Sequence, residues 1–230
     1  MVDYIKRMEE YSWLSSWAIW ENENGEKFTK EEDVNEEISF EKYESKLQPS
    51  NYVILGLNPG NIINNESGVM NHRKKIKTET ERPWSNFHNV GRSRDYLLAE
   101  AIRGTILEGS YMTDLFPIYN SDSFDFIKRF IKNREKEDVL KTAIKGFDEE
   151  MSLLVDNTDI VRLICIGGAV YDYADKYLIR NVFKLDLKKK YEVYKFYHYS
   201  GRNLKVSSKE DSNIYYPDIF KKTIEEYGLE

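Results

Sequence analysis

The chain has 230 residues, 40% hydrophobic and 32% charged, which is enough for one sizeable core and predicts a single domain over residues 1–230. Its one cysteine, Cys165, excludes an internal disulfide, and the lack of any CxxC or Cys/His cluster argues against zinc and iron–sulfur centres. The charged N-terminus and short apolar runs predict no signal peptide and no membrane span, so we expect a cytoplasmic protein without a membrane partner.

The net charge of −6 is unevenly distributed along the chain. Residues 1–50 hold 13 Asp/Glu against 6 Lys/Arg, whereas residues 72–94 hold 7 Lys/Arg against 2 Glu. Because phosphate binding depends on the local field, this basic segment is a candidate for contact with nucleic acid despite the acidic total. A solvated charged face is the alternative interpretation of the same segment.

Residues 1–48 are expected to form an accessory extension, since an aromatic-rich stretch, an acidic loop and a short helix precede Pro49. From residue 49 to residue 230 the hydrophobic pattern alternates between strands and helices. The predicted strands cover 51–57, 110–117, 159–168 and 191–200, and the predicted helices cover 93–109, 137–155, 169–178 and 216–228. This order predicts an α/β fold of three αβα layers around a four-stranded, mostly parallel sheet.

Polar residues follow the predicted strands where those strands end, in the stretches GLNPG, TDLFP and HYSGR, and the remaining strand ends in IGG. The carboxyl ends of parallel strands meet at one edge of a sheet, and such sheets bind ligands there. Core packing does not require this placement of polar groups. The sequence therefore predicts a functional site at this edge.

Four segments in order resemble motifs of the uracil-DNA glycosylase superfamily. ILGLNPG (54–60) is similar to the first motif of its mismatch-specific and single-strand-selective branches, and YHYSGR (197–202) resembles the second motif. GSYMTDLFPIYNSDS (109–123) and RLICIGGAVYDYADKYL (162–178) look like the middle strand and the strand–helix unit between them. The resemblance covers roughly residues 50–225 and leaves the first 48 uncovered. Tyr199 replaces the proline that is usual in the second motif.

The resemblance implies a monofunctional DNA glycosylase, a hydrolase that cleaves the N-glycosidic bond of a flipped uracil-like or modified pyrimidine base. Asn58 would orient the attacking water, and the His198 imidazole would stabilise negative charge on the departing base. No lysine stands in a motif position, so hydrolysis without a Schiff base is expected. The implied reaction needs no metal or organic cofactor, and we expect a monomer acting on DNA, with repair and defence against modified phage DNA both open.

Two further groups of residues follow from the same resemblance. The base-binding candidates are Gly56, Leu57, Gly60, Phe87, Trp84, Asp114 and Ser200, with Phe87 preferred to Trp84 for stacking on the base. The candidates for contact with the DNA backbone or for a wedge are Arg202, Gly201, Arg73, Lys74, Lys75, Arg92 and Arg94. For each of these residues an ordinary role in packing, in a turn or on a solvated surface is the competing interpretation.

Asp114 departs from the superfamily pattern, in which an Asn on this strand often reads uracil. An ionised carboxylate only accepts hydrogen bonds, so it would repel uracil O4 and suit an amino group such as cytosine N4. We therefore expect a base other than plain uracil. An Asp that caps a loop before LFP is the alternative.

Two other classes of protein stay open. A catalytically inactive protein of this fold could bind nucleic acid or a modified base without cleaving it. A nucleotide-binding α/β protein is less well supported, because neither GxGxxG nor GxxxxGK occurs in the chain.

Overall fold

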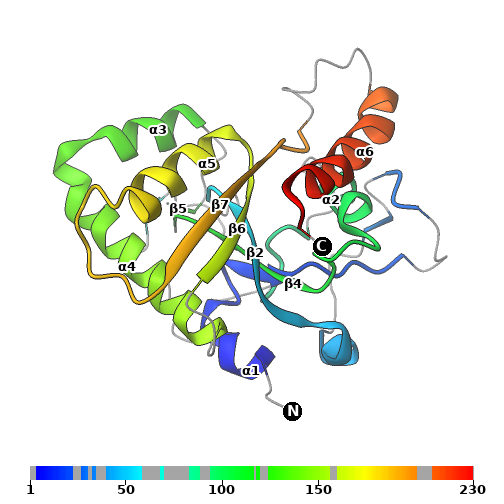
Figure 1. Cartoon of the computed structure of the whole chain (residues 1–230), viewed down its shortest axis with the longest axis horizontal. Helices are drawn as coiled ribbons and strands as arrows, with labels where there is room; N and C mark the ends of the chain where they lie inside the picture. Colours follow the sequence, from blue (N-terminus) through cyan, green and yellow to red (C-terminus); the bar gives the residue numbers. More distant parts are fainter. Residues whose placement is uncertain are drawn as a thin grey trace.

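Figure 1 shows the computed structural model, which describes residues 4–22, 27–30, 33–34, 40–58, 68–69, 83–88, 94–116, 118–119, 124–155, 160–200 and 209–229. Its central sheet has the strand order β1-β4-β2-β6-β7. The strands are β1 (Ser15–Trp17), β2 (Gln48–Gly56), β4 (Ser110–Asp114), β6 (Ile160–Ile166) and β7 (Lys190–Phe196). Strands β4, β2, β6 and β7 are parallel, whereas β1 pairs antiparallel with β4.

The prediction of an α/β fold with a mostly parallel sheet is confirmed, but the predicted number of four strands is wrong. The fifth strand, β1, comes from the N-terminal segment that the sequence suggested to be an accessory extension. It is only three residues long, and all three are buried. Two further strands, β3 (Gly68–Val69) and β5 (Ile118–Tyr119), form a separate pair.

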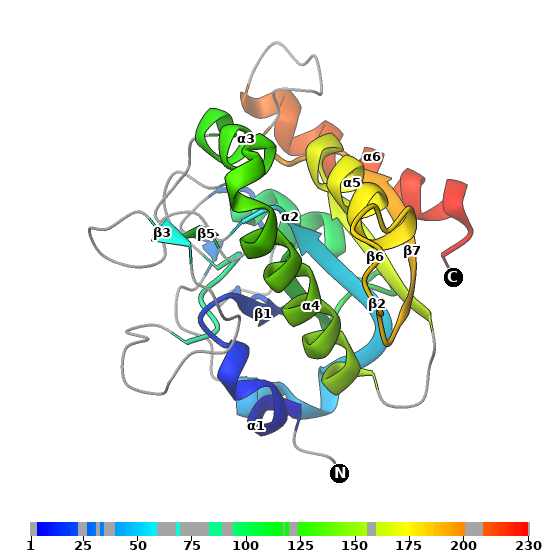
Figure 2. The ribbon, with the colours of Figure 1, turned by 90° about the vertical axis from the view of Figure 1, so that its left-hand side faces the viewer.

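Helices cover both faces of the sheet (Figures 1 and 2). One face carries α4 (Glu137–Leu154) and α5 (Gly168–Ala174), which continues into a π-helical turn, η5 (Asp175–Ile179). The other face carries α2 (Asp95–Ile102) and α6 (Lys209–Tyr227). The remaining described helices are α1 (Tyr4–Met8), α3 (Phe124–Lys132) and the short 3-10 helices η1 (Glu9–Tyr11), η3 (Phe40–Lys46) and η4 (Arg134–Lys136). None of the described helices is long and apolar enough to cross a membrane.

The two cores follow from the alternation of side chains along the strands. In β2, Val53 and Leu55 pack on the side of α4 and α5, whereas Ile54 packs on the side of α2 and α6. The side chains that α4 contributes to the first core include Ile144, Phe147 and Met151. Strands buried on both faces require helices on both faces, which is why the chain forms three layers.

Two helix boundaries differ from the prediction by seven residues each. The helix expected over 93–109 ends at Ile102, because Gly104 adopts a φ of +70° that no helix continues through. The last helix begins at residue 209, earlier than the predicted 216, so Pro217 lies inside it and not in its first turn. Proline is favoured in the first turn of a helix, but Pro217 lies in a later turn of α6.

Candidate active site

The carboxyl ends of four strands lie at one edge of the sheet, because β4, β2, β6 and β7 are parallel neighbours. Gly56 at the end of β2 is in register with Asp114 at the end of β4. His198 follows the end of β7 by two residues, and half-buried Asn58 follows the end of β2 by two. Neighbouring strands are about 4.8 Å apart, so the edge from β4 to β7 extends over about 14 Å. The sequence prediction that these residues share one edge is thus consistent with the sheet order.

Gly56 lies at the most crowded point of this edge. A Cβ atom on Gly56 would lie 2.2 Å from Asp114 Oδ1 and 2.9 Å from Phe87 Cζ, both well inside van der Waals contact. Only glycine therefore allows the carboxylate and the aromatic ring to approach the end of β2 together. This contact brings three predicted site residues into one cluster.

The Asp114 carboxylate is buried, with 2% of its residue surface exposed. The side-chain amide of Asn86 donates to Asp114 Oδ2 at 2.7 Å and to the carbonyl oxygen of Leu14 at 2.6 Å. Both N–H groups of the amide are thereby used, which leaves Asn86 Oδ1 as an acceptor. The side-chain oxygens of Asn86 and of an ionised Asp114 are therefore acceptors, and the Asn86 amide has no N–H group left to donate.

The segment 83–88, which carries Phe87, is held by the N-terminal residues. The Trp84 amide donates to the Ser12 carbonyl at 2.6 Å, and Ser16 Oγ donates to the Trp84 carbonyl at 2.9 Å. Trp84 and Phe87 both have a φ of 63°, a left-handed conformation that is unusual for a bulky residue. The N-terminal segment therefore contributes both a strand to the sheet and the support for a strained, aromatic part of the candidate site.

The two aromatic candidates for stacking on a base are separated by this geometry. Phe87 packs with the core on the side of α2 and touches the position of Gly56. Trp84 packs instead against the core on the side of α4, with its ring centroid 6.4 Å from that of Trp17. Of the two, Phe87 is the one next to Asp114 and the end of β2.

At the end of β6, Gly167 shapes the other half of the edge. Its backbone angles, φ 111° and ψ 151°, lie in a region that only glycine occupies readily. Its amide donates to the Phe196 carbonyl at 2.9 Å, which binds the end of β6 to the end of β7. A Cβ atom on Gly167 would lie 3.5 Å from His198 Cβ and Cδ2, so the imidazole lies directly over this backbone.

The imidazole of His198 has a defined hydrogen-bonding state. The backbone amide of Ser200 donates to His198 Nδ1 at 3.0 Å, so Nδ1 is an acceptor and the neutral ring carries its proton on Nε2. The ring also stacks on that of Tyr199, with centroids 4.6 Å apart. Arg94 Nη1 donates to the Ser200 carbonyl at 3.4 Å, which ties the start of α2 to the residues that follow His198. His198 is therefore a positioned donor through Nε2.

Tyr199 links the two halves of the edge. It follows His198 in the chain but is buried near the carboxylates of Asp95, at the start of α2, and Asp114, at the end of β4. Burial raises the pKa of its phenol well above the ordinary value, and the negative charges of Asp95 and Asp114 raise it further. The phenol consequently stays protonated at neutral pH.

The remaining predicted residues have different outcomes. Half-buried Leu57 accepts a backbone hydrogen bond from Phe116 at 3.0 Å and packs against the core, which is a structural role. Arg94 contacts the Ser200 carbonyl, as described above. The predicted residues that lie outside the described part of the chain are Gly60, Arg73, Lys74, Lys75, Arg92, Gly201 and Arg202.

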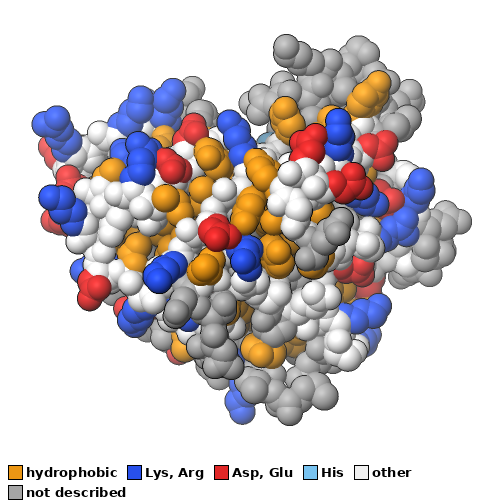
Figure 3. Space-filling view, in the orientation of Figure 1, with side chains coloured by type: hydrophobic (Ala, Val, Ile, Leu, Met, Phe, Trp, Pro, Cys, Tyr) orange, Lys and Arg blue, Asp and Glu red, His pale blue; other side chains and the backbone are white. Residues whose placement is uncertain are grey.

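The surface charge of the described residues is mixed on the face that Figure 3 shows. Lys and Arg lie among Asp and Glu around a central area of hydrophobic side chains. Most of the segment 72–94, which the sequence suggested as the basic surface for DNA, is outside the described residues. Among the described residues, no group of three or more His, Cys, Asp or Glu side chains could hold a metal ion.

Sequence reasoning missed Asn86, Tyr199 and Asp95 as parts of the site. Asn86 was visible only as a polar residue between Trp84 and Phe87, with no pattern to pair it with a residue 28 positions later.

No protein family matches this chain, and neither does any curated protein or solved structure.

Proposed function

We propose that this chain is a monofunctional DNA glycosylase that hydrolyses the N-glycosidic bond of a flipped base. The observation that most supports the proposal is the hydrogen bond from the Ser200 amide to His198 Nδ1, which in a neutral ring requires the proton to be on Nε2. A neutral imidazole that donates through Nε2 can bind a carbonyl oxygen of the base. This hydrogen bond strengthens as the base departs as an anion, so it favours the transition state over the ground state.

The other residues of the edge have complementary roles in this proposal. Asn58, after β2, orients a water molecule toward C1′, the bond from C1′ to the base nitrogen breaks, and the base leaves with the bonding electrons. The water oxygen becomes bonded to C1′, and its proton is released. A neutral amide cannot take that proton, so catalysis depends mainly on stabilising the departing base. Phe87 provides an aromatic surface beside the same cluster.

The acceptors on the β4 side specify the kind of base. Because Asn86 uses both N–H groups and an ionised Asp114 only accepts, this pair favours a base with an amino group over plain uracil. We propose a cytosine-like or modified pyrimidine as substrate, with DNA repair or defence against modified DNA as the setting. Because Asn86 contacts Asp114, we propose that Asn86 Oδ1 shares the recognition of the base that the sequence assigned to Asp114 alone.

A single assay tests this function. The protein is incubated with oligonucleotides that contain uracil, hypoxanthine, a thymine mismatch or modified cytosines, and alkali then converts abasic sites into strand breaks. We expect breaks at a modified cytosine, and a loss of about two orders of magnitude in rate for His198→Ala, which removes a charge-stabilising donor. Asn58→Ala is also expected to lose activity. Asn133→Ala is the matched control, since Asn133 is exposed and its side chain accepts only from the Glu135 amide in the short helix η4.

The outcomes separate the two classes of protein. Breaks that both site variants abolish and the control retains support an enzyme. Binding of the same oligonucleotides without breaks would instead support a protein that recognises a base and does not cleave it. Release of uracil as readily as any other base, with no change in Asn86→Ala or Asp114→Asn, would contradict the proposed base preference.

A further inference from the structure

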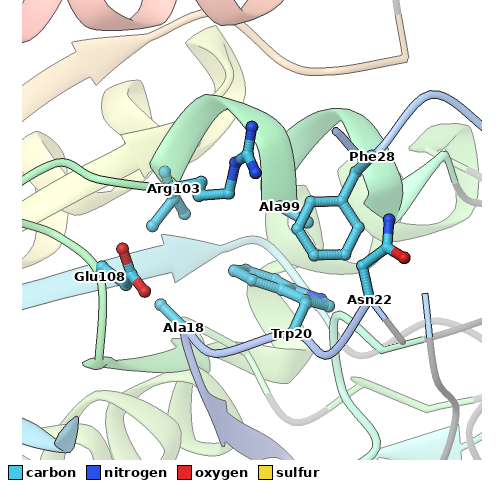
Figure 4. A pocket seen from close by; sticks show the side chains of 8 residues that line it. Ala18, Trp20, Asn22, Phe28, Ala99, Arg103 and Glu108 are labelled. Carbon is cyan, nitrogen blue, oxygen red and sulfur yellow. The ribbon is translucent and has the colours of Figure 1, made fainter. Parts of the chain in front are cut away.

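A cavity of about 230 Å³ lies at the opposite end of β4 from Asp114. The residues that line it are Ala18, Trp20, Asn22, Phe28, Ala99, Ile102, Arg103 and Glu108 (Figure 4). Ala18 donates to the carbonyl of Ser110, the first residue of β4, whereas Asp114 is the last residue of that strand. Four residues of strand separate these points by about 13 Å. The cavity is therefore distinct from the candidate active site.

The lining has an apolar floor and a polar rim. Ala18, Phe28, Ala99 and Ile102 are buried, and the two alanines leave open the space that larger side chains would fill. Asn22, Arg103 and Glu108 are half-buried and lie around this floor (Figure 4). Apolar walls with a few polar groups converging on them are typical of sites for small molecules.

Trp20 forms a wall whose position is fixed. Its indole N–H donates to the Phe87 carbonyl at 3.1 Å, and its ring stacks on His88 with centroids 5.0 Å apart and 30° between the planes. One face of the indole is thus covered by His88, and the rest of the ring lines the cavity. Because this hydrogen bond and the stacking on His88 both hold the indole, its ring does not move into the cavity and fill it.

The opposite wall is held by α2. The Phe28 amide donates to Glu100 Oε2 at 3.1 Å, and Glu100 Oε1 pairs with Arg103 Nη2 at 3.1 Å. These contacts connect the segment that carries Phe28 to the helix that carries Ala99 and Arg103. Two aromatic walls are therefore set in place without a ligand, which reduces the entropy cost of binding one.

Size and charge limit the ligand. An apolar cavity of about 150 Å³ holds benzene, so this larger cavity is suited to one substituted ring or two fused rings. Around it, the guanidinium of Arg103 is already paired with Glu100, and Glu108 adds a second carboxylate. Glu108 Oε2 accepts from the Gly104 amide at 2.7 Å, which fixes the carboxylate at the rim. This balance disfavours an anionic ligand and favours a neutral one with N–H donors.

We propose that this cavity binds an uncharged, amino-substituted heteroaromatic ring of nucleobase size. The ring packs against Trp20 and Phe28, and its amino group donates to the Glu108 carboxylate. Asn22 lies at the same rim, where its Nδ2 donates to the Lys27 carbonyl at 3.4 Å. This site does not depend on the proposed glycosylase activity, because it shares no lining residue with the candidate active site.

Calorimetric titration of the full chain with adenine and with cytosine tests the proposal. We expect saturable binding of one ring per chain for at least one of them. Uracil has no exocyclic amino group and adenosine 5′-monophosphate is an anion, so both should bind about tenfold more weakly or worse, as expected for losing a hydrogen bond to a charged group. Equal binding of uracil, or tighter binding of the monophosphate, would overturn the assignment of Glu108.

Variants distinguish this cavity from the candidate active site. Ala99→Leu fills the floor and should abolish binding, and Glu108→Gln should remove the preference for an amino group. Glu137→Gln is the control, because Glu137 is exposed at the start of α4. His198→Ala should leave binding unchanged. The proposal is wrong if the chain binds neither base, or if binding survives Ala99→Leu with the fold intact by circular dichroism.

Discussion

The two halves of the candidate edge are built differently. On the β2–β4 side, Gly56, Asp114 and Asn86 form a buried cluster in which side chains fix one another. On the β6–β7 side, half-buried His198 is held by backbone, through the Gly167 turn and the Ser200 amide. In the proposed function, the buried acceptors recognise the edge of the base. The half-exposed His198, which the backbone holds in place, donates a hydrogen bond to the negative charge that develops on the departing base. The difference predicts that substitutions on the first side mainly change stability and specificity.

The largest effect is expected for Gly56→Ala. The added methyl group would overlap Asp114 Oδ1 and Phe87 Cζ, and neither can withdraw easily, because Asn86 holds the carboxylate and the Phe87 backbone is anchored. We expect a loss of about 3 kcal/mol in the free energy of unfolding, measured by urea denaturation.

Gly104→Ala is the matched control for that substitution. Gly104 has a φ of +70° but no heavy atom within 4 Å of an added Cβ, so only backbone strain is tested. We expect a cost of about 1 kcal/mol. If the two substitutions lower the free energy of unfolding by the same amount, then Asp114 and Phe87 are not packed tightly against Gly56.

The second effect concerns the Asn86–Asp114 hydrogen bond. Asn86→Ala leaves Asp114 Oδ2 and the Leu14 carbonyl without the donor they share, which should cost about 2 kcal/mol. A double-mutant cycle with Asp114→Ala isolates the pair, and we expect a coupling energy of about 1.5 kcal/mol or more. A coupling energy of zero would mean that Asn86 stabilises the protein only through the Leu14 carbonyl. It would contradict the hydrogen bond to Asp114 and the arrangement of acceptors inferred from it.

These contacts mark the limit of what the sequence could predict. The strands of the parallel sheet were predicted from apolar runs such as 51–57, and the shared edge followed from their order. Strand β1 was not predictable, because Ser15, Ser16 and Trp17 give no hydrophobic alternation over three residues. The Asn86–Asp114 pair joins a loop to a strand end 28 residues away, and the N-terminal segment holds that loop through hydrogen bonds that no sequence pattern predicts.

The smallest effect tests whether Tyr199 couples the two halves. Its phenol has a pKa raised well above the ordinary value of 10.0 by burial and by the charges of Asp95 and Asp114. Above pH 10 the unfolded chain loses this proton while the native chain keeps it, so stability falls as pH rises, by up to about 1.4 kcal/mol per pH unit for one such group. Below pH 10 the phenol is protonated in both states and contributes no slope.

Tyr199→Phe should therefore make the alkaline loss of stability less steep, as measured by urea denaturation between pH 9 and pH 11. Buried Tyr216 and Cys165 also have raised pKa values, so part of the slope should remain. Tyr197→Phe, at an exposed ring, is the control and should leave the slope unchanged. Asp114→Asn should lower the pKa of Tyr199 and shorten the range over which it contributes, because it removes one of the two negative charges that raise this pKa. If Asp114→Asn has no effect while Tyr199→Phe does, the charge of Asp114 does not contribute to the shift, and the β6–β7 side is not electrostatically coupled to the acceptors on the β2–β4 side.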